Sequence, residues 1–179
     1  MWTPQRALVA FVVGGIAGTL LDQIHVHYHV LWYPKPWLWG QAWWVAPLMG
    51  LATLAIVSAA DWWMVRRPDA GRDEGVLEAA GMFVAAYWAS GQWHQHPIGL
   101  AIAYAIVMPL RTTRPSTLAF AGLLALGGTL FEIGLSGTGA FSYRFPDFLG
   151  VPLWLPGLYL HAAALGLAVA RALRPPAPL

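Results

Sequence analysis

The 179-residue sequence contains no cysteine, one lysine and few charged residues of either sign. Without cysteine, disulfides, thiolate metal sites and cysteine nucleophiles are excluded. Charged residues make up 10% of the chain, whereas soluble domains carry about 25%. The basic residues are scattered along the chain and are not massed on one face, so no nucleic-acid partner is expected. Because 58% of the residues are hydrophobic and the mean hydropathy is +0.56, we expect an integral membrane protein.

Apolar segments approach the length of about 20 residues that a helix needs to cross the hydrocarbon core. They predict an all-α, polytopic bundle of six transmembrane helices that forms one domain over residues 1–179. The first segment is longer than a signal-peptide core and is followed by no clear cleavage site. The predicted helices are residues 7–24, 41–65, 76–93, 98–110, 117–136 and 151–173, with the fourth the shortest.

The arginines are distributed unequally between the two sides that six spans would create. Eight of the ten basic residues fall on the side of the termini, and Lys35 and Arg144 fall on the other. Because short cytoplasmic loops retain Lys and Arg, this asymmetry predicts that both termini are cytoplasmic. The larger group consists of Arg6, Arg66, Arg67, Arg72, Arg111, Arg114, Arg171 and Arg174.

Polar side chains inside the predicted spans are candidates for function, because burying an ionisable group in a membrane is costly. Glu132 and His161 lie deepest, and we expect them to share a hydrogen bond or to line a polar patch in a cavity. Gln23 and Gln92 are further candidates for hydrogen bonding to a ligand.

A cluster of ligating residues on the predicted outer side leaves a second hypothesis open. Imidazole and carboxylate groups suit zinc or iron, and such a site would make the protein a metal-dependent membrane enzyme that acts on lipid. However, neighbouring histidines diverge in direction on a helix, and no HExxH spacing occurs. The candidate ligands are Asp22, His25, His29, His94 and His96.

Two other functional classes receive less support. No Gly-x-Ser-x-Gly elbow, phosphate loop or dinucleotide fingerprint is present, so a nucleophilic enzyme is not indicated. A transporter would be expected to carry repeats and broken helices, and the two halves of the sequence show no convincing repeat. Close helix packing is indicated by Gly14 and Gly18 and by Gly127 and Gly128, and a homo-oligomer is possible.

Three short motifs resemble the Insig family. Residues 142–151 (SYRFPDFLGV), followed by Trp154-Leu155-Pro156, resemble the family's loop before the last helix. Residues 42–47 (AWWVAP) with Gly50, and the turn at residues 111–116, match in the same order. The resemblance implies six spans and a non-enzymatic protein that holds a lipid inside the helix bundle and needs no cofactor.

The resemblance also suggests the residues of a ligand pocket, and one departure from the family pattern limits what can be expected of partners. Matching positions place Phe83 and Ile106 on the pocket wall. Leu110 stands where the family has a partner-contacting Asp, so regulation of a partner membrane protein of the animal kind is not expected. Nine arginines against one lysine, with abundant Ala, Gly and Pro, indicate a high-GC bacterial genome, so a bacterial inner membrane is the expected location. Because sterols are usually unavailable in bacteria, a diacylglycerol-like ligand is expected ahead of a sterol-like one.

The leading hypothesis is a lipid-binding cavity with an apolar wall and a few polar groups that orient the headgroup. Hydrocarbon contacts are predicted for Phe83, Tyr87, Ile106 and Trp154. Hydrogen bonds to the headgroup are predicted for Gln23, Gln92, Glu132 and His161.

Overall fold

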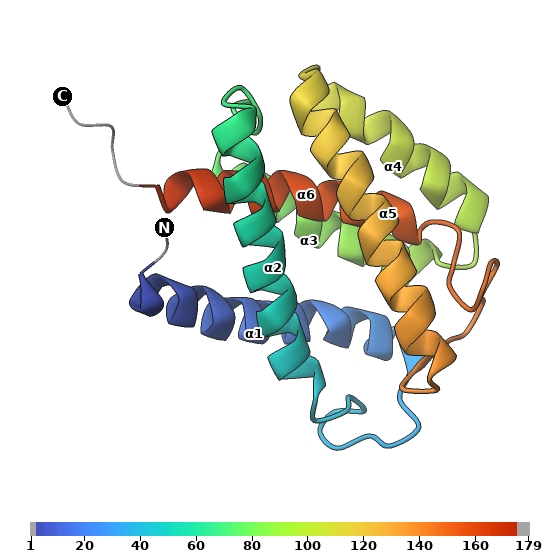
Figure 1. Cartoon of the computed structure of the whole chain (residues 1–179). Coiled ribbons are helices and arrows are strands. Elements are labelled where there is room, and N and C mark those ends of the chain that lie inside the picture. The colour runs from blue at the N-terminus through green and yellow to red at the C-terminus, as the bar shows by residue number, and fades with distance from the viewer. Residues whose placement is uncertain (1–2, 175–179) are drawn as a thin grey trace.

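The computed structural model describes residues 3–174, in which six helices form one bundle (Figure 1). The predominantly helical architecture confirms the prediction from hydropathy. The helices are α1 (Pro4–His27), α2 (Val45–Arg66), α3 (Val76–Trp93), α4 (Pro97–Arg111), α5 (Pro115–Gly137) and α6 (Leu155–Ala172), and the strands are β1 (Leu31–Trp32) and β2 (Ser142–Tyr143).

Four of the helices, α1, α2, α5 and α6, are long and apolar enough to cross a membrane. Helix α4 has 15 residues, about 22 Å at the usual rise. Helix α1 continues to His27, so the prediction that a loop begins at His25 was wrong. The hydropathy pattern ended the helix too early because backbone hydrogen bonding continues past the last strongly apolar residue.

Both described ends of the chain lie at the same end of the bundle. The Arg6 guanidinium donates to the backbone carbonyl of Leu173 at 2.7 Å. Arg174 forms an ion pair with Asp61, near the end of α2, at 2.7 Å. An even number of crossings would place the chain ends in this way.

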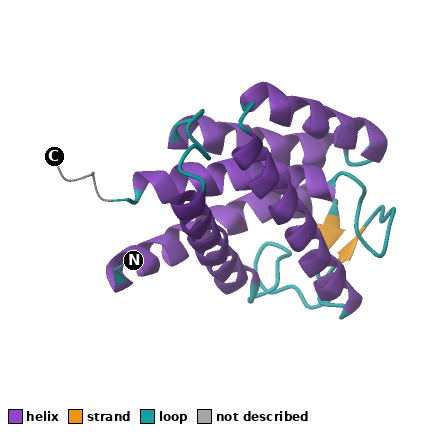
Figure 2. Ribbon diagram, turned by 45° about the horizontal axis from the view of Figure 1, so that its top comes forward, coloured by secondary structure: helices purple, strands orange, loops and turns teal. Residues whose placement is uncertain are grey.

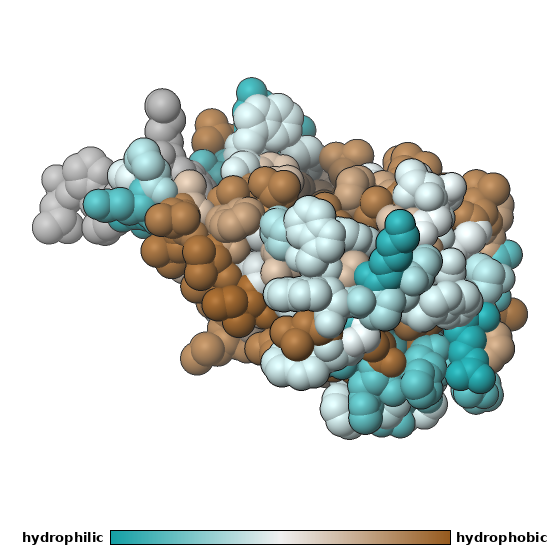
Figure 3. All heavy atoms as spheres, turned by 90° about the horizontal axis from the view of Figure 1, so that it is seen from below, coloured by the Kyte–Doolittle hydropathy of each residue, from teal (hydrophilic) through white to brown (hydrophobic). Residues whose placement is uncertain are grey.

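At the opposite end, two long loops meet in a small antiparallel ladder (Figure 2). Leu31 pairs with Tyr143, and Trp32 pairs with Ser142. The hydropathy pattern did not predict these strands, because each has two residues and a period cannot be read from so short a run. Viewed toward this end, pale and teal side chains gather on the surface, with brown, hydrophobic side chains on its flank (Figure 3).

The two loops and their flanking helices are copies of one structural unit, offset by 110 positions. A bridge joins Leu38 to Gln41, and an equivalent bridge joins Phe148 to Val151. Helices α2 and α6 begin at equivalent positions, 45 and 155. Between the bridged residues, positive φ angles recur at Trp39 (50°), Gly40 (82°), Leu149 (48°) and Gly150 (84°).

This repeat was missed in the sequence, where the two halves show no convincing repeat. It relates the α1–α2 unit to the α5–α6 unit and skips α3 and α4, so a comparison of the two halves misses it. Trp32 and Ser142 are equivalent and face each other in the ladder, which places an approximate two-fold axis between them. Because α1 and α5 begin at the same end of the bundle, the repeat is parallel and not inverted.

Close packing within each unit depends on equivalent glycines. A Cβ atom on Gly18 would overlap Met49, and one on Gly128 would overlap the ring of Tyr159. The small-residue spacing at Gly14 and Gly18 therefore serves contacts inside the chain, between α1 and α2.

We expect Gly128→Ala to lower the free energy of unfolding by about 1–3 kcal/mol, since the rigid ring of Tyr159 cannot move aside without repacking. Neighbouring Gly127 has open space around its Cβ position. Gly127→Ala should therefore be neutral or stabilising by about 0.5–1 kcal/mol through helix propensity. Denaturant unfolding in detergent measures both, and equal effects would contradict the packing role.

Candidate functional site

A cavity of about 950 Å³ lies around the two-fold axis, between the two repeated units. Its walls come from α1, α2, α5 and α6, with Phe83 and Tyr87 contributed by α3. Helix α3 packs against both α1 and α6 and so covers that side of the cavity. On the equivalent side, between α2 and α5, the wall residues Leu51 and Phe131 are 57% and 52% exposed. The cavity therefore reaches the lipid-facing surface there.

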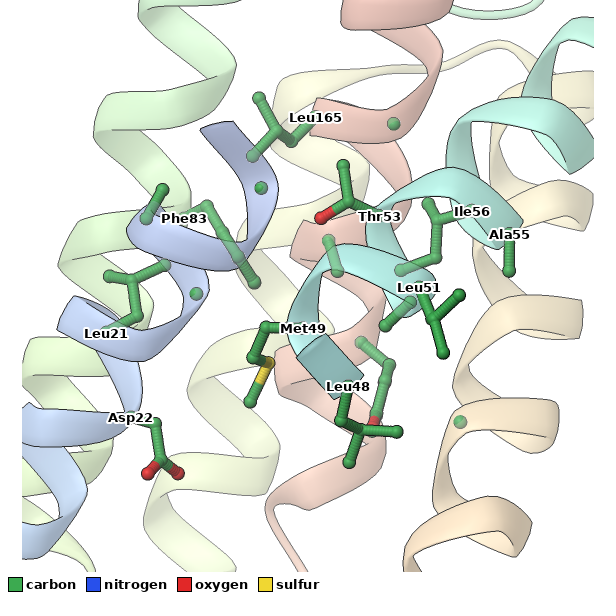
Figure 4. Close-up of a pocket in the computed structure, with 18 of the residues that line it drawn as sticks. Leu21, Asp22, Leu48, Met49, Leu51, Thr53, Ala55, Ile56, Phe83 and Leu165 are labelled. Atoms are coloured by element: carbon green, nitrogen blue, oxygen red, sulfur yellow. The ribbon is translucent and has the colours of Figure 1, made fainter. Parts of the chain in front are cut away.

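The lining is mostly aliphatic and aromatic, with polar groups gathered toward the ladder end. Figure 4 shows Asp22 at one end of the space, apart from labelled apolar side chains such as Leu48, Met49 and Phe83. Toward the other end, the cavity extends to Gln5 and Arg6 at the start of α1. The space therefore has the apolar length and the polar end that an amphiphile requires.

Two equivalent acid–tyrosine pairs form the polar end. The Tyr33 hydroxyl donates to Asp22 Oδ2 at 2.9 Å, and the Tyr143 hydroxyl donates to Glu132 Oε2 at 3.2 Å. All four residues line the cavity and are related by the 110-position offset. Burial and the adjacent carboxylate raise the pKa of each of these two tyrosines, so both hydroxyls stay protonated and act as donors.

The surroundings of the two carboxyl groups differ. Asp22 Oδ2 also accepts a hydrogen bond from Gln41 Nε2 at 2.7 Å. Glu132 Oε1 instead accepts from the hydroxyl of Tyr159 at 3.0 Å, so each of its oxygens has a tyrosine partner.

One turn beyond Asp22, His25 joins the polar end. Its Nε2 lies 2.7 Å from the hydroxyl of Ser90 on α3. The Ser90 hydroxyl also lies 3.2 and 3.0 Å from the carbonyl oxygens of Ala86 and Tyr87, and when its single proton goes to one of them, His25 Nε2 carries a proton and donates to Ser90. The ring of Tyr87 stacks on His25 with centroids 4.7 Å apart. Ser90 is fully buried and does not line the cavity, so this Ser–His pair is not arranged as a nucleophile.

The residues predicted to contact lipid are divided between the cavity and other places. Phe83, Tyr87 and Glu132 line it. Ile106 is 56% exposed on the outside of α4, and Gln92 is also exposed. The remaining three do not line the cavity.

Of these three, Trp154 is fully buried in the core, with its ring against His25 and Tyr143. Gln23 donates to the backbone carbonyl of Trp39 at 3.2 Å. His161 accepts a hydrogen bond from Arg111.

The expectation that Glu132 and His161 share a polar patch was wrong. Arg111, which contacts His161, forms a two-point ion pair with Glu74 at 2.5 and 2.6 Å. His161 thus belongs to a buried cluster that ties α6 to the end of α4 and to the loop before α3. The error arose because depth along a span does not reveal which side of the helix a residue occupies.

The alternative metal ligands do not converge. Across residues 3–174, no three His, Asp or Glu side chains are grouped so that they could hold a metal ion. His29 and His96 are exposed. Asp22 and His25 lie at the cavity, whereas His94 Nδ1 donates to the backbone carbonyl of Gly91 at 2.9 Å.

Several residues at the polar end were not predicted. They are Tyr33, Gln41, Ser90, Tyr143 and Tyr159. The matching offset of an acid and a tyrosine, 22 and 33 against 132 and 143, is the sequence signal that could have revealed the two pairs.

Comparison with known proteins identifies the fold. No protein-family model matches the sequence, and no curated protein sequence does. A crystal structure of MvINS, a mycobacterial Insig homologue from Mycobacterium vanbaalenii, matches with a TM-score of 0.73 and 26% identity. A cross-linked MvINS trimer matches with a TM-score of 0.72, and both matches cover 94% of this chain and 96% of the other. With the matching motifs, these similarities show that the chain is an Insig-like, multi-pass membrane protein.

Proposed function

We propose that the protein is a non-enzymatic lipid-binding protein that holds a neutral amphiphile in the cavity between its repeated units. The observation that carries the proposal is a cavity of about 950 Å³ with apolar walls and a cluster of hydrogen-bonding groups at one end. That volume lies near the upper end of the usual range for ligand pockets, about 300–1,000 Å³. Phe83 and the aliphatic walls would contact hydrocarbon, while Asp22 and Tyr87 face the headgroup.

A two-chain lipid of the diacylglycerol type suits this cavity better than a rigid sterol. The cavity surrounds an approximate two-fold axis, with equivalent wall residues such as Leu48 and Leu158 on either side. A branched ligand can place one chain on each side and its glycerol at the polar end. The polar end also contains two carboxyl groups, Asp22 and Glu132, which disfavour an anionic phospholipid headgroup.

The membrane topology and the oligomeric state are proposed in part from the similarity to the Insig homologue. We propose six crossings, with both termini cytoplasmic, in a bacterial inner membrane, because the arginine-rich end of the bundle also holds Arg6 and Arg174, near the two described ends of the chain. The solved MvINS relative has been cross-linked as a trimer, and a homotrimer is proposed here by analogy. Regulation of a further membrane protein is not part of the proposal.

Native mass spectrometry after gentle purification, with metal analysis of the same sample, tests this function. We expect a retained neutral lipid and no stoichiometric metal. Ala162→Trp places a large ring in the cavity and should reduce lipid occupancy at least tenfold, whereas Ala105→Trp, on the exposed side of α4, should not.

Ala52→Phe, at the position equivalent to Ala162, provides a second blocking variant if the first does not fold. Full lipid occupancy in folded Ala162→Trp or Ala52→Phe protein would contradict the cavity as the binding site. Metal together with histidine-dependent turnover would overturn the non-enzymatic proposal.

A further inference from the structure

Asp22 has a hydrogen-bonding capacity that the protein does not use. The residue is 4% exposed and lines the cavity. Its Oδ2 accepts from both Tyr33 and Gln41. Within residues 3–174, the other oxygen, Oδ1, has no hydrogen-bond partner and keeps accessible surface at the cavity. An acceptor in this position is suited to a ligand that donates a hydrogen bond.

Two neighbouring groups complete this side of the cavity. His25 lies one turn along α1 from Asp22, and its Nε2 is engaged with Ser90. In the tautomer in which Nε2 donates to Ser90, the remaining ring nitrogen, Nδ1, is unprotonated and can accept. Tyr87 lines the cavity beside His25, and its hydroxyl has no partner among the described residues. One donor and two acceptors thus lie together without mutual hydrogen bonds.

The equivalent half of the repeat lacks these free groups. Both Glu132 oxygens accept from tyrosines. The position equivalent to His25 is Leu135, and the position equivalent to Gln41 is Val151. The two halves therefore share a backbone framework but differ in polarity, so a ligand meets a hydrogen-bonding wall on one side and a satisfied wall on the other.

We propose that Asp22, His25 and Tyr87 form a subsite that recognises a free hydroxyl group on the lipid. The ligand hydroxyl donates to Asp22 Oδ1 or His25 Nδ1 and accepts a hydrogen bond from the Tyr87 hydroxyl. This inference rests on the proposed lipid-binding function and adds a specificity. A lipid whose hydroxyl is capped by an ester has no proton to donate, and it would leave Asp22 Oδ1 buried without a partner. Because the two repeated units differ in polarity, the ligand would bind in one of the two orientations that a symmetric cavity would allow.

The test compares two probes, a diacylglycerol and the same molecule with its hydroxyl acetylated, binding to the full-length protein in nanodiscs. We expect the acetylated probe to bind at least about tenfold more weakly, the usual effect of losing one hydrogen bond to a charged group. The selectivity ratio is the Kd of the acetylated probe divided by the Kd of the free diacylglycerol. In Asp22→Asn, this ratio should fall toward one because affinity for the free alcohol decreases. His25→Leu, which installs the residue found at the equivalent position 135, is the second variant and should lower the ratio as well.

Glu78→Gln is the matched comparison, because it alters a carboxyl that is exposed on α3 and does not line the cavity. Its selectivity ratio should stay within about twofold of the original. Equal binding of both probes, abolished by Ala162→Trp, would overturn the hydroxyl subsite and leave the lipid-binding function intact. Binding of neither probe would count against both proposals.

Discussion

Replacing Arg111 by alanine should destabilise the protein by about 3–5 kcal/mol, the usual cost of leaving one member of a buried ion pair unmatched. The side chains of Arg111 and Glu74 are 6% and 10% exposed, and two hydrogen bonds join them. Arg111 also donates to His161 on α6. Its removal leaves a buried carboxylate and an imidazole nitrogen without their donor, and thermal unfolding in detergent would measure the loss.

Arg114 is the matched control, because it also pairs with an acidic residue of the loop before α3. Its partner is Asp73, at 2.7 Å, and the two side chains are 39% and 25% exposed. Exposed pairs contribute about 0–1 kcal/mol, so Arg114→Ala should have a small effect. Comparable losses in the two variants would refute burial as the source of the Arg111 effect.

Trp154→Ala is expected to lower the free energy of unfolding by about 3–5 kcal/mol, the range for deleting a large buried aromatic side chain. Trp154 has no exposed surface and packs in the core between His25 and Tyr143, which belong to different repeated units. Its loss would leave a void behind the polar end of the cavity. Equilibrium unfolding and lipid occupancy should therefore both decline.

Trp43 provides the comparison for Trp154, being 69% exposed in the first loop. Surface substitutions away from special features usually change stability by about 0.5 kcal/mol or less. Trp43→Ala should therefore unfold at nearly the original temperature. If Trp154→Ala were equally harmless, its assignment to the core would be wrong and direct contact with lipid would regain support.

The helices could be predicted from the sequence, whereas the partners of their polar residues could not. Hydropathy reports how far an apolar segment extends, and α3 runs over residues 76–93 as expected. It does not report which way a side chain points. Leu51 and His161 show this, because they are equivalent in the repeat, yet Leu51 is 57% exposed and His161 is 1% exposed. Helix α4 covers His161 through Arg111, whereas no described element covers Leu51 in the same way.

Only part of the candidate site was predicted, again because hydropathy does not report which way a side chain points. Phe83, Tyr87 and Glu132 were proposed and do line the cavity. Asp22 was considered as a metal ligand, because its neighbours in sequence are histidines, and its tyrosine partner is 11 residues away across a loop. Pairs of this kind depend on how the loop turns back after its helix, and the residue with a positive φ between Asp22 and Tyr33 is His29 (55°).

The uncovered side of the cavity determines which lipids can reach it. Leu51 lies six residues after the start of α2, and Phe131 lies six residues before the end of α5, so both sit about 9 Å from the ladder end of their helices. In the other half of the bundle, the wall residues Val9 and Val13 of α1 are 60% and 59% exposed. The cavity would therefore be accessible from both leaflets in the proposed orientation, and exchange of ligand would depend on the composition of each.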